Sequence, residues 1–286
     1  MSRVREQFRS VLARPTCTLA ANIFDPLSAS IAHMLEYEVC VLSGSVGKVA
    51  NLGVPDGVLS NMSDVVDHCR RITRIADVSL MVDAEDGFGN AVNVARTVRE
   101  MEAAGVSAIE IEDNFVPKKL GVQNPGLISK EEQVGKLQAA VAARTDPTTV
   151  IVARSAALGL TTLDEALDRI QAYSQTGAEA LMLTGSSRRD QLEAVHRVTT
   201  LPLCVLSPPA DIRNDPAFLA ANGVKILMLG NPTFAVAVKA IVDSLRHLKE
   251  GGSLEELGDR QATPDLLRCI NRTDEFLQWQ EEYLRS

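Results

Sequence analysis

The chain has 286 residues, of which 45% are hydrophobic, and a formal net charge of −8. This length and composition suit one large domain with a sizeable core. The acidic balance, without a basic stripe, argues against nucleic acid and membrane surfaces as partners, and no apolar run reaches the roughly 18 residues of a membrane span.

Eight short apolar runs, rich in Val, Ile and Leu, predict strands that are covered on both faces. In chain order they are 18–23, 39–42, 79–82, 108–111, 149–153, 180–183, 202–206 and 225–229. Helical patterns between them include 90–104, 163–174 and 233–249. This alternation predicts an α/β fold, a (β/α)8 TIM-type barrel, with a doubly wound sheet as the alternative.

The pattern changes after Gly251-Gly252, beyond the last predicted strand. Residues 263–284 form a late helical pattern that contains the single tryptophan, Trp279. We therefore predict a barrel catalytic domain over residues 1–252 and a C-terminal helical arm over residues 253–286. The arm either caps the barrel or packs on a neighbouring subunit, and the tryptophan favours the second.

In a (β/α)8 barrel the active site lies at the carboxyl ends of the strands. Among the residues that follow the predicted strands there, our candidates are Ser43, Gly44, Ser45, Asp56, Asp83, Glu85, Glu112, Arg154 and Asn231.

Carboxylates are the main group among these candidates. Asp83 and Glu85 are two residues apart, so both side chains point to the same side of a strand. Crowded carboxylates repel one another unless a cation lies among them, and oxygen ligands without His or Cys suit Mg²⁺ or Mn²⁺. We therefore predict a metal site at Asp83, Glu85 and Glu112. A role in turns or helix caps is the alternative, and it fits Asp86 and Asp113 better.

Arg154 directly follows the apolar run 149–153. A guanidinium at the end of a strand is costly unless it meets an anion. That anion is either one of the same carboxylates or the carboxylate of a substrate. The backbone N–H groups of Ser43-Gly44-Ser45 could also bind carboxylate oxygens.

Histidine and cysteine chemistry is not expected at this site. The four histidines fall within helical patterns, and the five cysteines form no CxxC pair, with Cys204 inside the seventh strand. Neither a Ser-His-Asp nor a Cys-His arrangement is available, so catalysis would depend on a metal and on electrostatics. Scattered cysteines and an N-terminus without a signal-peptide pattern predict a cytoplasmic protein.

Four motifs in this order resemble those of the isocitrate lyase/phosphoenolpyruvate mutase superfamily. Residues 82–90 (VDAEDGFGN) resemble its D-A-D-x-G-[FY]-G-N segment, and residues 52–56 (LGVPD) resemble its L-G-x-P-D loop. Residues 111–113 (IED) and 153–154 (AR) match two further motifs. The resemblance covers nearly the whole chain and implies a barrel of this kind.

The resemblance also implies roles for the candidates. Asp83 would be the direct Mg²⁺ ligand, and Asp56, Glu85 and Glu112 would hold water molecules of the metal. Ser45 and Arg154 would bind the substrate. The protein would be a homo-oligomer, a tetramer or a dimer, that exchanges its last helix between subunits.

Within the superfamily the chain is most similar to the bacterial oxaloacetate decarboxylases, through residues 24–28 (FDPLS), 44–46 (GSV), 128–136 and 276–283. Residues 117–121 (PKKLG) lack the Cys and His of the lyase motif K-[KR]-C-G-H, and residues 123–125 (QNP) lack the Ser of the mutase gating loop. Two residues depart from the decarboxylase pattern, because Glu85 replaces an Asp and Asn231 replaces a His.

The resemblance implies Mg²⁺-dependent decarboxylation of oxaloacetate, a small dianionic 2-oxo acid, to pyruvate and CO₂ through an enolate. Arg154 and Asn231 would be catalytic, and Ser43, Gly44 and Ser45 would bind the substrate. Lysis of a 2-substituted malate and P–C chemistry on phosphonopyruvate are alternatives, as is a barrel that binds metal and ligand without catalysis. Whether the loop 116–128 closes over the site stays open.

Overall fold

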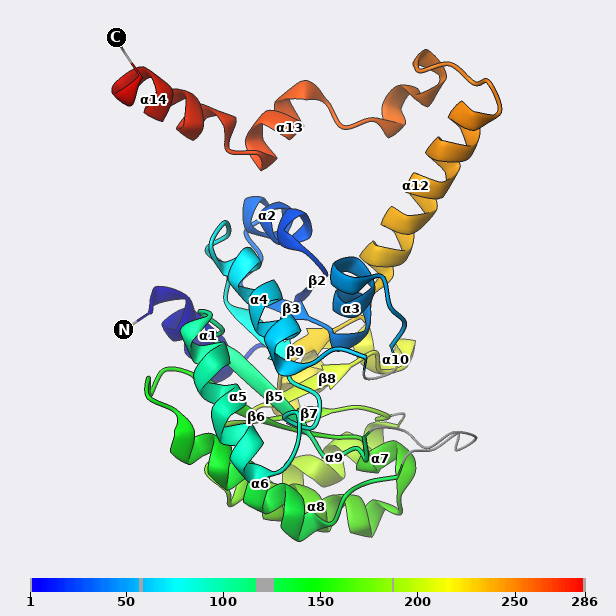
Figure 1. Cartoon of the computed structure of the whole chain (residues 1–286). Helices are drawn as coiled ribbons and strands as arrows, with labels where there is room; N and C mark the ends of the chain where they lie inside the picture. The colour runs from blue at the N-terminus through cyan, green and yellow to red at the C-terminus, as the bar shows by residue number, and fades with distance from the viewer. Residues whose placement is uncertain (1, 57–58, 117–125, 187, 285–286) are drawn as a thin grey trace.

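The computed structural model describes residues 2–56, 59–116, 126–186 and 188–284. Its centre is a nine-stranded parallel sheet in the order β1-β9-β8-β7-β6-β5-β4-β3-β2 (Figure 1). The strands are β1 Thr18–Leu19, β2 Ala21–Ile23, β3 Cys40–Leu42, β4 Leu80–Asp83, β5 Ala108–Glu112, β6 Val150–Ser155, β7 Ala180–Leu183, β8 Leu203–Leu206 and β9 Val224–Met228.

The first predicted strand is divided in two, because residues 18–23 form β1 and β2 on either side of Ala20. β1 pairs with β9, and β2 pairs with β3. The Ala20 amide donates to the Leu227 carbonyl (3.0 Å), and the Ala21 amide donates to the Val39 carbonyl (2.9 Å). Adjacent residues therefore join the two ends of the sheet. The sheet is closed into the predicted TIM-type barrel, and the doubly wound alternative is wrong.

The chain also forms helices, most of which cover this barrel (Figure 1). They are α1 Arg3–Ala13, α2 Pro26–Met34, α3 Gly44–Leu52, α4 Met62–Thr73, α5 Ala91–Ala103, α6 Lys130–Ala143, α7 Ala157–Leu160, α8 Leu163–Ser174, α9 Arg189–Val198, α10 Ala210–Arg213, α11 Pro216–Ala221, α12 Pro232–Lys249, α13 Pro264–Ile270 and α14 Thr273–Tyr283, with a 3-10 helix at Glu255–Arg260.

The predicted helices over 90–104, 163–174 and 233–249 are confirmed as α5, α8 and α12, each within one residue. The late helical pattern over 263–284 corresponds to two helices, α13 and α14. The chain breaks between α13 and α14 at Arg272, whose φ is 53°. That left-handed conformation cannot continue a right-handed α-helix.

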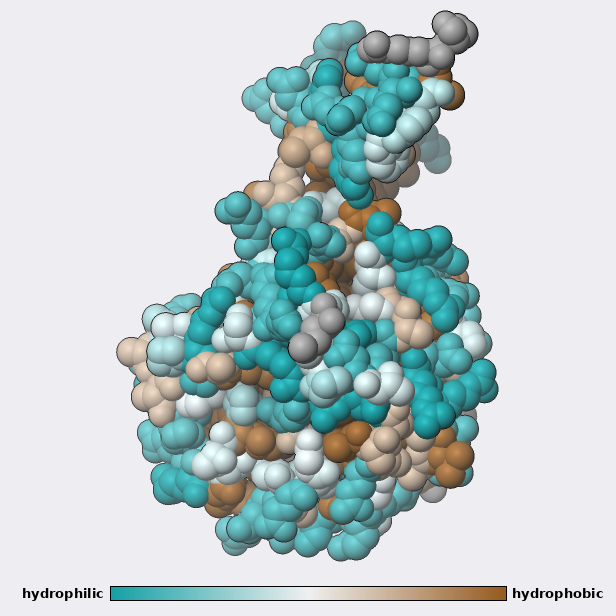
Figure 2. All heavy atoms as spheres, turned by 90° about the vertical axis from the view of Figure 1, so that its left-hand side faces the viewer, coloured by the Kyte–Doolittle hydropathy of each residue, from teal (hydrophilic) through white to brown (hydrophobic). Residues whose placement is uncertain are grey.

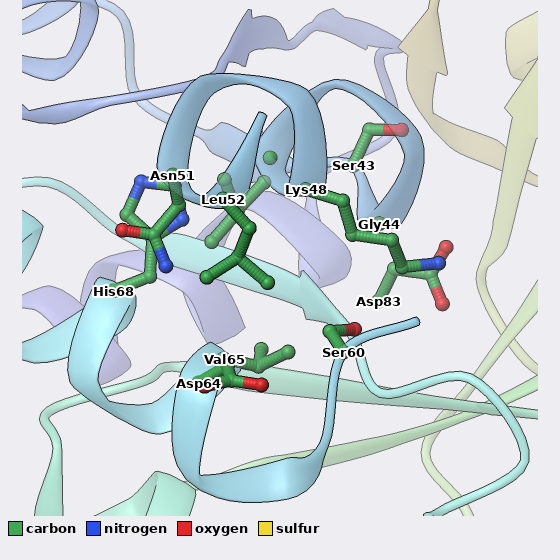
Figure 3. A pocket seen from close by; sticks show the side chains of 12 residues that line it. Ser43, Gly44, Lys48, Asn51, Leu52, Ser60, Asp64, Val65, His68 and Asp83 are labelled. Atoms are coloured by element: carbon green, nitrogen blue, oxygen red, sulfur yellow. The ribbon is translucent and has the colours of Figure 1, made fainter. Parts of the chain in front are cut away.

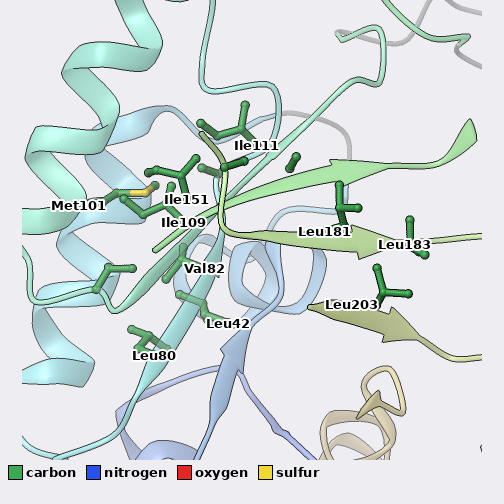
Figure 4. Close-up of a cluster of buried hydrophobic side chains, with 14 of the residues drawn as sticks. Leu42, Leu80, Val82, Met101, Ile109, Ile111, Ile151, Leu181, Leu183 and Leu203 are labelled. Atoms are coloured by element: carbon green, nitrogen blue, oxygen red, sulfur yellow. The ribbon is translucent and has the colours of Figure 1, made fainter. Parts of the chain in front are cut away.

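Alternate residues along the strands divide into an outer and an inner set. The outer set packs against the helices in one large core, which includes Leu80, Ile109 and Ile151 with Met101 of α5 (Figure 4). The inner set fills the barrel and includes Val41, Met81, Ala108, Val152 and Met182. The strands are therefore apolar on both faces, as their composition predicted.

Helix α1 closes the amino-terminal end of the barrel. Its Phe8 is fully buried and packs with the inner set of strand residues. Arg5 Nε donates to the Val106 carbonyl (2.9 Å), and Arg9 Nε donates to the Thr148 carbonyl (3.0 Å). Both acceptors lie two residues before a strand begins, so α1 is attached to the end of the barrel that is remote from the site.

Helix α12 leads away from the barrel to an arm formed by α13 and α14 (Figure 1). It has no buried residue, and Figure 2 shows apolar surface on the stem between the barrel and the arm. The arm returns toward the barrel, because α13 contacts α2 and Arg272 Nη1 donates to the Ile75 carbonyl (3.2 Å). Among the described helices, none combines the length and the apolar character that crossing a membrane requires.

We predict that Phe8→Ala lowers the free energy of unfolding by about 3–5 kcal/mol, because it leaves a cavity in the closed end of the barrel. Urea unfolding followed by circular dichroism at one protein concentration measures the loss. Val92→Ala is the control, since Val92 is 79% exposed and its loss should change stability by about 0.5 kcal/mol or less. Equal effects of the two substitutions would show that α1 is not part of the core.

Candidate active site

The predicted site residues gather at the carboxyl ends of the strands. Asp83 ends β4, Glu112 ends β5, and Arg154 is the last residue but one of β6. The parallel pairing places Glu112 directly opposite Arg154. Ser43 and Asn231 follow β3 and β9 and precede helices α3 and α12. The structure therefore brings together residues that are far apart in the sequence.

Arg154 lies among three carboxylates. Its Nη1 donates to Asp83 Oδ2 (2.5 Å) and to Glu110 Oε2 (3.2 Å), and its Nε lies 3.2 Å from Glu112 Oε2. The side chain is 18% exposed, so these contacts form largely out of water. The sequence left two possible anions for Arg154, the carboxylates of the chain and that of a substrate. In this structure Arg154 pairs with the carboxylates of the chain.

A second buried cation, Lys48 on α3, was not singled out by the sequence pattern. Its Nζ lies 3.0 Å from Asp56 Oδ1 and also forms an ion pair with Glu85, and its side chain is 2% exposed. Figure 3 shows the side chain extending from α3 toward Asp83. Lys48 follows Gly44 by four residues, so both lie on one face of α3. That spacing could have identified it.

Glu110 was also missed. It is 1% exposed and lies on β5, paired in register with Asp83. The signal was its spacing of two residues from Glu112, which places both side chains on the same face of a strand. Within an apolar run, a carboxylate on the inner face of a barrel requires a buried cation, and here that cation is Arg154.

The pKa values reflect this crowding. Burial and the nearby charge of Asp83 together raise the pKa of Glu85 to about 7, although Lys48 opposes the shift. Burial likewise raises the pKa of Glu110 to about 7 and that of Glu112 to about 8, although Arg154 opposes both shifts. For Asp83, the effect of burial is outweighed by Arg154, the backbone N–H of Glu85 and Lys48 together, so its pKa lies below the ordinary value. Among these four buried carboxylates, Asp83 is thus the one most firmly held in its ionised form.

The segment Ser43-Gly44-Ser45 forms the start of a helix, because Gly44 begins α3 and Ser43 is its N-cap residue. Ser43 Oγ lies 3.1 Å from Ser45 Oγ. Asn231 Nδ2 lies 3.4 Å from each of these hydroxyls, and its Oδ1 has no hydrogen-bond partner among the described residues. Two hydroxyls and an amide with one free acceptor therefore lie beside the carboxylates.

Five carboxylates thus face two cations at the barrel mouth, namely Asp56, Asp83, Glu85, Glu110 and Glu112 against Lys48 and Arg154. No group of three metal-ligating side chains within the described ranges is arranged around a common point. The donor set nevertheless suits a hard divalent cation, since it is all oxygen and in excess of the positive charge.

Gly44 adds to this fit. A Cβ there would lie 2.8 Å from Glu85 Oε1 and 3.1 Å from Asp83 Oδ2. Any other residue at position 44 would therefore require the Glu85 or Asp83 side chain to move. The absence of a side chain brings the start of α3 directly against the acidic pair.

The loop over residues 116–128 is described only at its ends. Residues 117–125, which include the two motif positions at 117–121 and 123–125, lie outside the described part of the chain, as does Gly57. The Phe115 amide donates to the Gly126 carbonyl (3.0 Å), and the Ile128 amide donates to the Asp113 carbonyl (2.9 Å). Asp113 is fully buried and accepts hydrogen bonds from Ser155 and Tyr173, so it supports the loop ends rather than a helix cap.

Without divalent cations, we predict that the free energy of unfolding falls as the pH rises from about 6.5 to about 8. The pKa values of Glu85 and Glu112 are about 7 and about 8 in the folded chain, against an ordinary value of 4.5. The folded state therefore holds protons that the unfolded chain has already lost, so the free energy of unfolding falls with rising pH until both groups are ionised in the folded chain as well.

Urea unfolding in EDTA across this pH range measures the slope. A Glu112→Gln variant should give a flatter slope, because the group with the most raised pKa is gone. A wild-type slope that is flat or rises with pH would contradict the prediction.

Comparison with known proteins agrees with these features. Residues 8–249 match the family described as phosphoenolpyruvate phosphomutase. An oxaloacetate decarboxylase from Rhodopseudomonas palustris (strain BisA53) is 40% identical over 270 residues, which cover 94% of this chain and 93% of the relative. Another from Paraburkholderia xenovorans (strain LB400) is 37% identical over 281 residues, covering 98% and 93%.

Solved structures are similar along the whole chain. A phosphoenolpyruvate phosphomutase from Streptomyces platensis subsp. rosaceus matches with a TM-score of 0.88 at 28% identity, covering 98% of this chain and 99% of that one. A phosphonopyruvate hydrolase in complex with oxalate and Mg²⁺ matches with a TM-score of 0.85 at 30% identity, covering 99% of each. The resemblance seen in the motifs is confirmed, and the chain belongs to the phosphoenolpyruvate phosphomutase family of enzymes.

Proposed function

We propose that the protein is a carbon–carbon lyase that decarboxylates oxaloacetate to pyruvate and CO₂ with the help of Mg²⁺. The observation that carries this proposal is the cluster of Asp83, Glu85 and Glu112 beside Arg154 at the mouth of the barrel. The oxaloacetate decarboxylases at 37–40% identity support the choice of substrate.

Asp83 would hold the metal directly, because Arg154 and Lys48 favour the ionised form of its buried carboxylate. Asp56, Glu85 and Glu112 would hold water molecules of the metal, and Mn²⁺ would suit the same oxygen ligands. When bound, the cation would supply positive charge close to the carbonyl oxygen of the substrate, where negative charge develops.

The residues of the chain would bind and orient the dianion. Arg154 would turn part of its guanidinium from the carboxylates to the substrate, where it neutralises a carboxylate or the developing enolate oxygen. The N-terminal N–H groups of α3 at Ser43, Gly44 and Ser45, with Asn231, would orient the carboxylate that leaves as CO₂. Water would then supply the proton that converts the enolate to pyruvate.

Two related activities compete with this proposal. The similarity to a phosphonopyruvate hydrolase favours P–C bond cleavage as the second candidate, and lysis of a 2-substituted malate would use the same enolate. Incubation with oxaloacetate, phosphonopyruvate and substituted malates, with products followed by NMR, separates the three. Binding of Mg²⁺ and oxalate without turnover of any of them would instead indicate a barrel without catalysis.

Arg154→Ala should lower kcat/KM for oxaloacetate by roughly 100-fold or more, because a charge-assisted contact to the reacting anion is lost. Pyruvate release at saturating Mg²⁺ measures the effect. Arg99→Ala is the matched control, since Arg99 is exposed on α5 and should leave activity unchanged. Turnover near the wild-type rate in Arg154→Ala would contradict the role of Arg154.

We further propose that the protein is a cytoplasmic homo-oligomer, a dimer or a tetramer, whose subunits exchange their C-terminal helices. Apolar side chains on α12 are largely exposed, among them Val236 (68%), Ile241 (58%) and Leu245 (64%). An uncovered apolar face of this extent favours contact with a second copy. All five cysteines are free, which supports a reducing compartment.

Ile241→Glu should shift the protein toward smaller assemblies, because a charge would then be buried where subunits meet. Light scattering coupled to size-exclusion chromatography measures the molar mass. Val92→Glu, at an exposed position on α5, should leave the mass unchanged. A wild-type protein that elutes as a monomer at micromolar concentration would refute the oligomer.

A further inference from the structure

Glu110 is a buried carboxylate for which the proposed mechanism has no use. It lies on the inner face of β5 and is 1% exposed, with Asp83 and Val152 as its register partners. Toward the amino-terminal end of the barrel, the inner layer is apolar and includes Ala108. An ionised carboxylate at the boundary of an apolar layer is strongly unfavourable unless a cation compensates it.

Arg154 is that cation. Within the described residues, Glu110 forms its ion pair with Arg154, whose Nη1 lies 3.2 Å from Glu110 Oε2. The other oxygen, Oε1, is buried without a hydrogen-bond partner in the same part of the chain. Glu110 therefore has a single cationic partner, which it shares with Asp83 and Glu112.

The three carboxylates around Arg154 differ in what else they can bind. Asp83 and Glu112 end their strands at the barrel mouth, where the proposed cation would be held. Glu110 comes two residues earlier on β5, about 6.6 Å deeper along the strand. A cation that draws on Asp83 and Glu112 would leave Glu110 as the carboxylate that still pairs with Arg154.

We propose that Glu110 is a positioning residue that fixes the Arg154 guanidinium at the barrel mouth while Asp83 and Glu112 serve the metal. This inference rests on the proposed function, because it places the metal at Asp83 and the substrate anion at Arg154. Glu110 contacts neither of them and acts through Arg154. A guanidinium held by one deep anchor keeps its remaining N–H groups directed at the ligand, as outer partners of a metal site do for its ligands.

A double-mutant cycle tests the coupling. Glu110→Gln keeps the shape and a hydrogen-bond acceptor but removes the charge. At saturating Mg²⁺, it should weaken binding of oxalate, measured by calorimetry, roughly tenfold. In an Arg154→Met background, the same change should alter oxalate affinity less than about twofold, since no guanidinium is left to position. Equal losses in both backgrounds would overturn the proposal and leave Glu110 a structural role.

Two control variants complete the cycle. Glu110→Asp keeps the charge and should recover part of the affinity lost in Glu110→Gln. Glu179→Gln removes a carboxylate that pairs with Arg9 and Arg144 at the opposite end of the barrel, and it should not alter oxalate binding. A loss in Glu179→Gln as large as that in Glu110→Gln would overturn the proposal, because the effect would then be general.

A second measurement detects the ion pair between Arg154 and Glu110 in the absence of substrate. In Mg²⁺-saturated protein labelled with ¹⁵N-arginine, the Nε–H resonance of Arg154 is identified by its absence from Arg154→Met. It should shift in Glu110→Gln and not in Glu179→Gln. An identical resonance in the wild type and Glu110→Gln would overturn the proposal. Failure of the wild type to bind oxalate or release pyruvate would count against the proposed function alone, because this resonance does not depend on either.

Discussion

The pairing of Arg154 with Asp83, Glu110 and Glu112 is the interaction on which the barrel mouth depends. Two unit charges 4 Å apart interact by about 4 kcal/mol at an effective dielectric constant near 20. Like charges that are crowded out of water therefore need a cation among them. Since the four residues come from β4, β5 and β6, the same ion cluster joins three neighbouring strands at the end where the chemistry is proposed.

The two ends of the barrel interior differ in character: one end carries the charged residues of the proposed site, and the other carries apolar residues that stabilise the fold. At the carboxyl end the inner residues are charged, whereas the inner set nearer the amino-terminal end is apolar and is closed by Phe8 of α1. Apolar burial at about 25 cal/mol per Å² is the dominant stabilising contribution of such a core. The closed end can thus offset the cost of burying Glu110 and Lys48, which by themselves would be unfavourable.

Much of this arrangement could be predicted from the sequence, because it depends on local patterns. Strand runs identify the barrel, and the rule that sites lie at strand ends identifies Asp83, Glu112 and Arg154. Lys48 and Glu110 were missed because a lysine in a helix and a glutamate in a strand are common, and their spacing from Gly44 and Glu112 is only a weak signal. Their partners are distant in the sequence, and only the closed barrel brings them together. The break between α13 and α14 was missed for another reason. Arg272 has a φ of 53°, but an arginine is not a residue type that indicates a turn.

The two cations also bear on how a metal would bind. Lys48 holds Asp56 and Glu85, and Arg154 holds Asp83 and Glu112, so every carboxylate assigned to the metal already has a positive partner. A divalent cation would therefore have to displace existing ion pairs rather than fill bare carboxylates. Its binding would gain less free energy than the number of acidic groups suggests. In return, the chain would keep the site assembled before the metal arrives, and the displaced Arg154 would become available to an anionic substrate.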